Sequence, residues 1–275
     1  MKKFAKMSLV AAVAVAGLSS TVSAQDLSEA IKGTQVSGSL YMRYDERKDT
    51  TNGAAGANDP YHTVKLLVGV KNQVNDDVTF NSTAGGKTQG ANAANLSLLH
   101  ANFTYTGLEN TAVTFGKMGM DTPFTNAKDP VDFADIANGV TANYTIGTAT
   151  LHAAYYANNN IDGSTANNGD SAGVNIKSNS VAVLAAMGSV GPLNLSGAYA
   201  YSGGTAATSG LGDGFDAIYA NANGKVGVLN LGISYAELEG DNIAQLDKQE
   251  SMTVTASAPV GPVTLGAKYN TTGNK

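Results

Sequence analysis

Four aspartates gather within a short stretch of a chain of which only 14% is charged. They lie between Gly116 and Gly139, at Asp121, Asp129, Asp132 and Asp135. Carboxylates grouped in this way attract cations, and carboxylate oxygens are also the ligands that Ca²⁺ prefers. The stretch predicts either a charge filter for passing solutes or a solvated acidic loop. A divalent cation held by Asp132, Asp135 and a third carboxylate is a further hypothesis.

Other residue types that do chemistry show no such pattern. The histidines His62, His100 and His152 do not have the spacing of metal ligands and are better explained as polar strand positions. The segment GLGDG at Gly210–Gly214 lacks the strand, helix and Lys-Ser/Thr ending of a phosphate loop. The absence of Cys excludes a disulfide scaffold and a thiolate metal site. Since no Ser-His-Asp set can be inferred either, we expect no enzyme and no cofactor.

The first 24 residues have the composition of a secretory signal peptide. A start with three lysines is followed by the apolar run Met7–Leu18 and by small residues at Val22–Ala24. We therefore expect export and cleavage after Ala24. Removing the three lysines leaves 14 basic against 22 acidic residues, a net charge near −8, which argues against nucleic acid as a partner. No later apolar run is long enough for a membrane-spanning helix, so we expect either a soluble β-protein or a β-barrel.

Alternation of apolar and polar residues is the dominant pattern after the signal, and it is typical of β-strands. Leu99, Ala101, Phe103 and Tyr105, for example, alternate with polar residues. Thirteen strands are predicted in this way, around residues 36–44, 63–71, 78–84, 99–106, 112–117, 139–146, 149–157, 176–189, 193–202, 215–225, 228–237, 250–258 and 262–270. The long connections between them, 45–62, 85–95, 118–138, 158–175, 203–214 and 238–249, alternate strictly with short ones.

This alternation of short and long connections is the layout of an outer-membrane β-barrel. Only helices and closed barrels satisfy every backbone polar group in hydrocarbon. We therefore predict an all-β fold, a transmembrane antiparallel β-barrel over residues 25–275. Bacterial barrels have even strand numbers, so we expect either a piece of a barrel of about 16–18 strands or a miscount of a complete one of about 12 or 14.

Two sets of side chains fit the two faces of such a barrel. Aromatic residues near the ends of the odd-numbered strands share the parity of the apolar face and are expected to form a girdle at the lipid boundary, namely Tyr44, Phe115, Tyr155, Tyr201, Tyr235 and Tyr269. Basic and polar residues of the other parity are expected on a wet channel wall, namely Arg43, Lys65, Lys71, His100 and Lys268.

The acidic stretch then becomes the connection between the fifth and sixth strands, with residues 118–138 as a constriction loop. Its 21 residues are long enough to fold into a barrel. Asp129 as a cap, Pro130 at the first helical position and Asn138-Gly139 as a stop predict a helix. Its apolar side would rest on the inner wall, and its acids would face Arg43, Lys65 and Lys71. Such a transverse field favours cations.

Two stretches resemble a known porin family. The segment LSEAIKGTQVSGSLYMRYD resembles the mature start of the Campylobacter-type major outer membrane proteins, through Glu29, Ala30, Ile31, Lys32, Val36, Gly38, Leu40, Arg43, Tyr44 and Asp45. The segment VTFGKMGMDTPFT resembles the porin stretch that enters the inward loop, through Gly116, Lys117, Thr122, Pro123 and Phe124. The resemblance implies a general diffusion porin of a Gram-negative outer membrane, in contact with its lipid and lipopolysaccharide, usually homotrimeric and weakly cation-selective.

The expected function is thus a water-filled channel for passive diffusion of ions and small hydrophilic solutes. The alternative is an outer-membrane adhesin or structural barrel that binds surface ligands through loops such as 158–175 and 203–214. Bilayer conductance separates these two, because a plugged barrel gives no stable current steps.

Overall fold

A computed structural model provides the structure of the protein. It describes residues 33–45, 61–89, 95–120, 122–124, 133, 135–159, 180–203, 214–240 and 248–274. The predicted signal peptide and the acids Asp121, Asp129 and Asp132 lie outside the described residues. Within the described ranges, no helix has the length and apolar character needed to cross a membrane.

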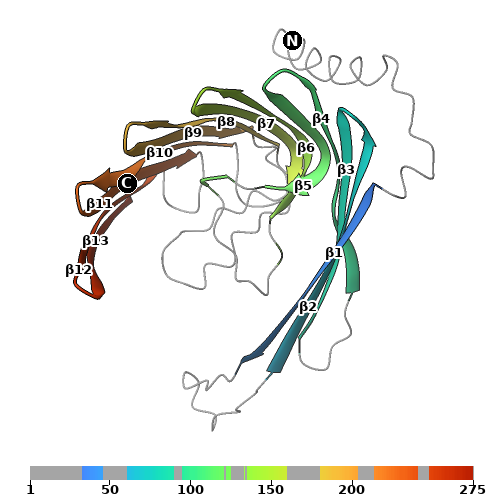
Figure 1. Cartoon of the computed structure of the whole chain (residues 1–275), viewed down its shortest axis with the longest axis horizontal. Coiled ribbons are helices and arrows are strands. Elements are labelled where there is room, and N and C mark those ends of the chain that lie inside the picture. Colours follow the sequence, from blue (N-terminus) through green and yellow to red (C-terminus); the bar gives the residue numbers. More distant parts are fainter. Residues whose placement is uncertain are drawn as a thin grey trace. The chain divides into compact units, whose positions relative to one another are not determined.

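Thirteen β-strands make up the described structure, and each is hydrogen-bonded to its neighbours in the chain (Figure 1). They are β1 (Thr34–Asp45), β2 (Tyr61–Asn75), β3 (Val78–Gln89), β4 (Asn95–Leu108), β5 (Thr111–Gly119), β6 (Ile136–Ile146), β7 (Ala149–Asn159), β8 (Val181–Val190), β9 (Leu193–Ser202), β10 (Phe215–Val226), β11 (Leu229–Gly240), β12 (Lys248–Val260) and β13 (Val263–Asn274). The strand order runs from β1 to β13, which are its two ends. The predicted number of strands and the alternation of short and long connections are confirmed.

The short connections are two-residue turns whose sequence explains their geometry. Gly191 and Gly261 have φ angles of 58° and 61°, and each is followed by proline. Glycine accepts this left-handed conformation without strain, and glycine at the first turn position suits the tight hairpin that matches the twist of two antiparallel strands. These turns fix the register of β8 on β9 and of β12 on β13. We call this end of the strands the short-turn end and the other the long-connection end.

The chain divides into two compact units at residue 114, within β5. Unit 1 contains β1–β4 and the start of β5. The pairs β1–β2, β2–β3 and β3–β4 are in register except for two irregularities, one of which places Leu99 of β4 in a bulge between the pairs Thr83–His100 and Ala84–Leu98. The ring centroids of Phe80 and Phe103, which are directly paired, lie 5.0 Å apart. Cross-strand aromatic pairs of this kind stabilise a sheet beyond its hydrogen bonds.

Unit 2 contains the rest of β5 and β6–β13, and it holds the main cluster of buried apolar residues. This cluster comprises Met118, Met120, Ala137, Ala154, Tyr156, Val181, Val183, Ala200, Phe215 and Ala217, with Phe124 and Leu238 packed against it. Direct pairing joins several members across β7–β10, as in Tyr156–Val181 and Ala200–Ala217. The cluster therefore lies on one face of the sheet, at the long-connection end.

The predicted helix from Asp129 to Asn138 is wrong in its last three residues, because β6 already begins at Ile136. Ala137 and Asn138 pair with Asn159 and Asn158 of β7, and Ala137 is buried. This long-range pairing overrides the local signal for a helix end. Since β5 also reaches Gly119, the connection spans 120–135 and is shorter at both ends than the predicted 118–138.

The third strand, β3, is also longer than predicted, because pairing with a neighbouring strand again overrides the local sequence signal. Alternation in the sequence ends near Ala84, but β3 continues to Gln89. Gly85 and Gly86 give no hydrophobic signal, yet they pair with Leu67 and Leu66 of β2. The extension brings Lys87 into the sheet, a residue that the sequence analysis had left in a loop.

Candidate functional site

Unit 1 has one polar and one apolar face. Register places Arg43, Lys65, Lys71 and His100 on the same face, through the pairs Arg43–Thr63, Tyr41–Lys65, Gln35–Lys71 and Thr83–His100. The opposite face carries the pairs Leu40–Leu66 and Gly38–Val68. Leu40, for example, is 63% exposed on this face. A protein surface in water rarely exposes a contiguous patch of large apolar side chains. The two faces thus suit water on one side and lipid on the other.

The same division holds in unit 2. Its polar face bears His152 and Asn143, whose Nδ1 and Oδ1 atoms are 2.8 Å apart. The other face carries large apolar side chains that are exposed, namely Leu151, Leu184, Leu195, Ile218, Ile233 and Leu265. Alternation of this kind along every strand is the pattern of a membrane barrel with a wet interior.

Amide and hydroxyl groups form a chain of hydrogen bonds on the polar face of unit 2. Ser189 Oγ donates to Asn194 Oδ1 (2.8 Å), and Asn194 Nδ2 donates to Asn223 Oδ1 (3.4 Å). Asn223 Nδ2 in turn donates to Asn221 Oδ1 (2.6 Å). Such groups leave further donors and acceptors that need water. This face is therefore built for solvent and not for a dry core.

All five predicted wall residues lie on a polar face. Arg43, Lys65, Lys71 and His100 belong to unit 1, and Lys268 belongs to unit 2 through its pair with Thr255. Register adds Lys87, opposite Lys65, and Lys225, opposite Asn230. The sequence analysis missed Lys87 because it lies beyond the predicted strand 78–84, and it did not name Lys225 as a wall residue although this residue lies within the predicted strand 215–225.

Acidic and basic side chains are distributed unequally between the faces of the strands, although Lys248 shares the face of the acids. Among the described side chains of β1–β4 and β6–β13, the polar faces carry bases and no acid: Arg43, Lys65, Lys71, Lys87, Lys225 and Lys268. The acids of these strands lie on the other face, at Asp216, Glu237, Glu239 and Glu250. Acidic groups on the polar side of unit 2 must therefore come from its connections.

The described part of the connection between β5 and β6 lies against the polar face of unit 2. At its base, the backbone N–H of Met120 donates to the carbonyl of Asp135 (2.8 Å). Met120, Thr122 and Asp135 are buried. The ring of Phe124 meets Tyr219 edge-on, with 6.5 Å between the centroids. Tyr219 shares its face of β10 with Asn221 and Asn223, so Phe124 of the connection rests on the wet side of the sheet.

Asp135 is the one predicted constriction acid among the described residues. It is buried, and its carbonyl closes the base of the connection. The described residues contain no group of three His, Cys, Asp or Glu that could hold a metal ion. The suggested divalent cation would need Asp132, which lies outside them, and stays a hypothesis.

The predicted girdle residues lie on the apolar faces. Tyr44 is exposed, and its ring centroid lies 5.0 Å from that of His62. Phe115 follows Thr114, whose hydroxyl oxygen lies 3.0 Å from that of Thr104 on the polar side, so alternation directs Phe115 the other way. Tyr155, Tyr201, Tyr235 and Tyr269 share the face of their apolar neighbours in β7, β9, β11 and β13.

The four tyrosines of unit 2 form a belt that crosses the strands obliquely. Tyr155 and Tyr201 lie in one row of paired residues, through Ala182. In β11 this row contains Glu239, which lies four residues past Tyr235. In β13 the neighbouring row contains Asn274, which lies five residues past Tyr269. The belt thus does not shift between β7 and β9 and shifts by four residues between β9 and β11.

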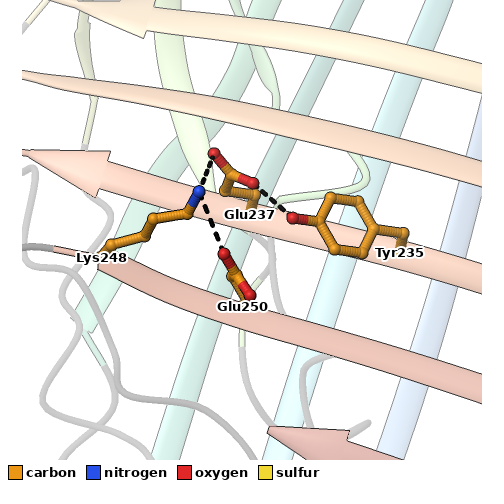
Figure 2. A network of polar contacts seen from close by, with 4 residues as sticks. All are labelled: Tyr235, Glu237, Lys248 and Glu250. Carbon is orange, nitrogen blue, oxygen red and sulfur yellow. Dashed lines mark hydrogen bonds and ion pairs between the residues drawn. The ribbon is translucent and has the colours of Figure 1, made fainter. Parts of the chain in front are cut away.

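A charged network lies beyond this belt, on the side of the long connections, and Figure 2 shows its four residues, Tyr235, Glu237, Lys248 and Glu250. Lys248 Nζ lies 2.9 Å from Glu237 Oε1 and 3.0 Å from Glu250 Oε1. The hydroxyl of Tyr235 donates to Glu237, and that of Tyr199 donates to Asp216 in the neighbouring strands. Charges on this face therefore begin only where the tyrosines end, as expected where hydrocarbon gives way to lipid head groups.

The profile of one family, described as Campylobacter major outer membrane protein, matches residues 1–250. The chain belongs to this family. Its place is accordingly the cell outer membrane, and the predicted resemblance and location are confirmed. No curated protein gave a significant sequence match.

Solved outer-membrane porins share the fold of this Campylobacter-family chain. OccD3 (OpdP) of Pseudomonas aeruginosa is 11% identical with a TM-score of 0.60, over 88% of this chain and 57% of that one. OccAB1 of Acinetobacter baumannii is 13% identical with a TM-score of 0.58, over 87% and 66%. A BenF-like porin of Pseudomonas fluorescens Pf-5 is 12% identical with a TM-score of 0.59, over 88% and 68%.

These likenesses confirm the predicted fold class, an all-β transmembrane barrel of antiparallel strands. The family member described here spans 57% of the length of OccD3 and 66% of that of OccAB1. The total of about 16–18 strands, the cleavage after Ala24 and the homotrimer stay predictions.

Proposed function

We propose that the protein forms a water-filled channel for passive diffusion of ions and small hydrophilic solutes across the outer membrane, and that it is not an enzyme. The observation that carries this proposal is the separation of each unit into a polar and an apolar face. In a closed barrel the apolar faces meet lipid and the polar faces surround water. Membership of the outer-membrane protein family supports the same function.

The channel favours cations, and the connection between β5 and β6 is the source of that preference. Its described part lies on the polar face of unit 2, anchored by Phe124 on Tyr219. Its sequence adds Asp121, Asp129, Asp132 and Asp135 to a wall whose described strand charges are all basic. Acids on one side of a narrow passage and bases on the other produce a transverse field that selects by charge.

Conductance in a planar lipid bilayer tests the channel. The full chain, purified in its folded form, is expected to give stable current steps that are linear in voltage. In a KCl gradient, the zero-current potential is expected to have the sign that indicates a larger flux of K⁺ than of Cl⁻. A folded barrel without current steps would instead support a plugged adhesin or structural barrel.

The membrane partners follow from the same arrangement. The tyrosine belt meets the lipid boundary, and the Lys248 network meets the polar layer of lipid and lipopolysaccharide beyond it. We also propose a homotrimer, which the family resemblance supports. An unboiled sample on a denaturing gel is expected to migrate as a trimer that boiling converts to monomer, and a monomer under both conditions would reject it.

A further inference from the structure

Three short turns of unit 2 share one sequence pattern: a valine, a glycine, a proline or valine, and then a leucine or valine. They are residues 190–193 between β8 and β9, 226–229 between β10 and β11, and 260–263 between β12 and β13. The first and last residues of each turn are paired with each other. The glycines have similar φ angles of 58°, 63° and 61°. The turns are therefore three copies of one structure, and none of them contains a charged side chain.

The apolar outer face of unit 2 continues without interruption into these turns. Between the turns and the level of the tyrosines, the outer positions of β8–β13 carry only valine, leucine, isoleucine, alanine or glycine. Val190 is 68% exposed, and Val228, inside the second turn, is 65% exposed. In unit 1, by contrast, the turn after β2 contains Asp76 and Asp77, and the turn after β4 contains Glu109. These three turns of unit 2 thus lack the charged groups that mark the start of water in unit 1.

The length of the apolar face places these turns at the membrane boundary. Tyr235 and Tyr269 lie eight residues beyond the glycines of their turns, Gly227 and Gly261. Eight residues of strand cover about 26 Å, which is about 20 Å of height at the tilt of about 35–45° found in membrane barrels. The apolar band of such barrels is about 25 Å tall. Hydrocarbon that begins at the tyrosines therefore reaches the turns.

Proline in two of the turns removes a polar group that lipid could not satisfy. In a two-residue hairpin turn, the flanking residues bond to each other, and the backbone groups of the two turn residues have no strand partner. Pro192 and Pro262 follow the turn glycines, and proline has no N–H. Because an unsatisfied N–H is costly in hydrocarbon, proline suits a turn that lies at the edge of lipid.

We propose that these three turns form a membrane anchor, which inserts into the inner, phospholipid leaflet of the outer membrane. The partner is lipid because the turns continue the face that already meets lipid, and because their exposed side chains are apolar. In water they would form an apolar patch, whereas burial at the lipid boundary removes that patch from water. Short turns of bacterial barrels lie on the periplasmic side, so the anchor acts opposite the tyrosine belt. It depends on the barrel fold and not on conduction.

Tryptophan fluorescence tests the anchor, because the chain contains neither Trp nor Cys. The full chain carrying Val228→Trp, or the matched control Asp76→Trp in a turn of unit 1, is refolded into phospholipid vesicles. Phospholipid brominated near the head-group end of its acyl chains quenches tryptophan that lies within the membrane. We expect this lipid to quench Val228→Trp about threefold more strongly than Asp76→Trp. Aqueous iodide is expected to quench the two variants in the opposite order.

A thiol serves as a second probe, because a tryptophan ring itself favours the lipid boundary. Val228→Cys and Asp76→Cys are treated with a charged maleimide on both sides of the membrane. The rate for each is divided by the rate of the same variant unfolded in urea. We expect Val228→Cys to react about tenfold more slowly than Asp76→Cys, because the reactive thiolate is disfavoured in apolar surroundings. Pro192→Cys, at the equivalent position of the first turn, takes its place if Val228→Cys does not fold.

Two outcomes would overturn the anchor. Equal maleimide rates in the two variants would mean that the turns stand in water. Slow modification without quenching by the brominated lipid would mean that protein, such as a second copy of this chain, covers them. Heat-modifiable migration verifies that each variant is folded. Since no step measures current, failure of the proposed channel would leave this test unaffected.

Discussion

Single residues on the apolar faces show how the barrel handles charge near lipid. Lys248 contacts two carboxylates, Glu237 and Glu250, and Tyr235 donates to the first of these. Partly exposed ion pairs contribute about 1 kcal/mol or less each. Their effect here is to offset part of the negative charge of the two carboxylates, because an unpaired charge at the edge of hydrocarbon is more costly than one in water.

Lys248→Met tests this network. It leaves the carboxylates of Glu237 and Glu250 without their shared cation, so we expect the folded barrel to melt at a temperature lower by about 2–4 °C. The measurement is the temperature at which the folded band disappears from a gel. The matched variant Lys225→Met, at an exposed position of the polar face, is expected to change this temperature by less than 1 °C. Equal effects would show that the network adds nothing.

At the scale of elements, the return of the chain into β6 depends on a tight contact between two strands. The register between β6 and β7 shifts between Asn138 and Gly139. A Cβ atom added at Gly139 would lie 2.1 Å from the carbonyl oxygen of Tyr155. The strands can approach this closely only because residue 139 has no side chain.

Gly139→Ala is therefore expected to destabilise the barrel by about 1–3 kcal/mol, through forced separation of β6 from β7. The fraction that refolds from denaturant into detergent micelles, read from gel migration, measures the effect. Gly197→Ala is the control, since its Cβ would lie 3.7 Å from the nearest atom, the carbonyl oxygen of Tyr219. Normal refolding of Gly139→Ala would mean that the bulge can relax.

Contacts of Phe124 and Met120 help to hold the described part of the connection between β5 and β6 on the wall. Phe124 meets Tyr219, and Met120 belongs to the buried cluster. Phe124→Ala removes the ring contact and apolar area, so we expect a looser connection, a higher conductance and larger current fluctuations. Phe103→Ala, on the apolar face of β4, serves as control for loss of a ring. Unchanged conductance in Phe124→Ala would show that this contact does not hold the constriction.

At the scale of the whole molecule, charge selectivity should depend on one segment. The described strand charges on the polar faces are basic, and the acids of the wall strands lie on the other side. The strand wall alone would therefore favour anions, and the acidic connection must outweigh it for cations to be preferred.

Replacing Asp121, Asp129, Asp132 and Asp135 together by Asn is consequently expected to reverse the sign of the zero-current potential in a KCl gradient, not merely to reduce it. The control Glu237→Gln/Glu250→Gln removes two acids from the outward side and should leave the potential unchanged. If the fourfold variant kept the native potential, the four acids would lie outside the ion path.

The strands, their number and the side on which most residues lie could be read from the sequence, because alternation with period two is a local property of consecutive residues. Arg43, Lys65, Lys268 and the tyrosine belt were found in this way. Lys87 was not, because the glycine-rich end of β3 shows no alternation and only pairing with β2 reveals it. The start of β6 at Ile136, the contact of Phe124 with Tyr219 and the meeting of Lys65 with Lys87 were decided by the tertiary structure. Each depends on register between segments far apart in the chain, and no local pattern of side chains encodes that register.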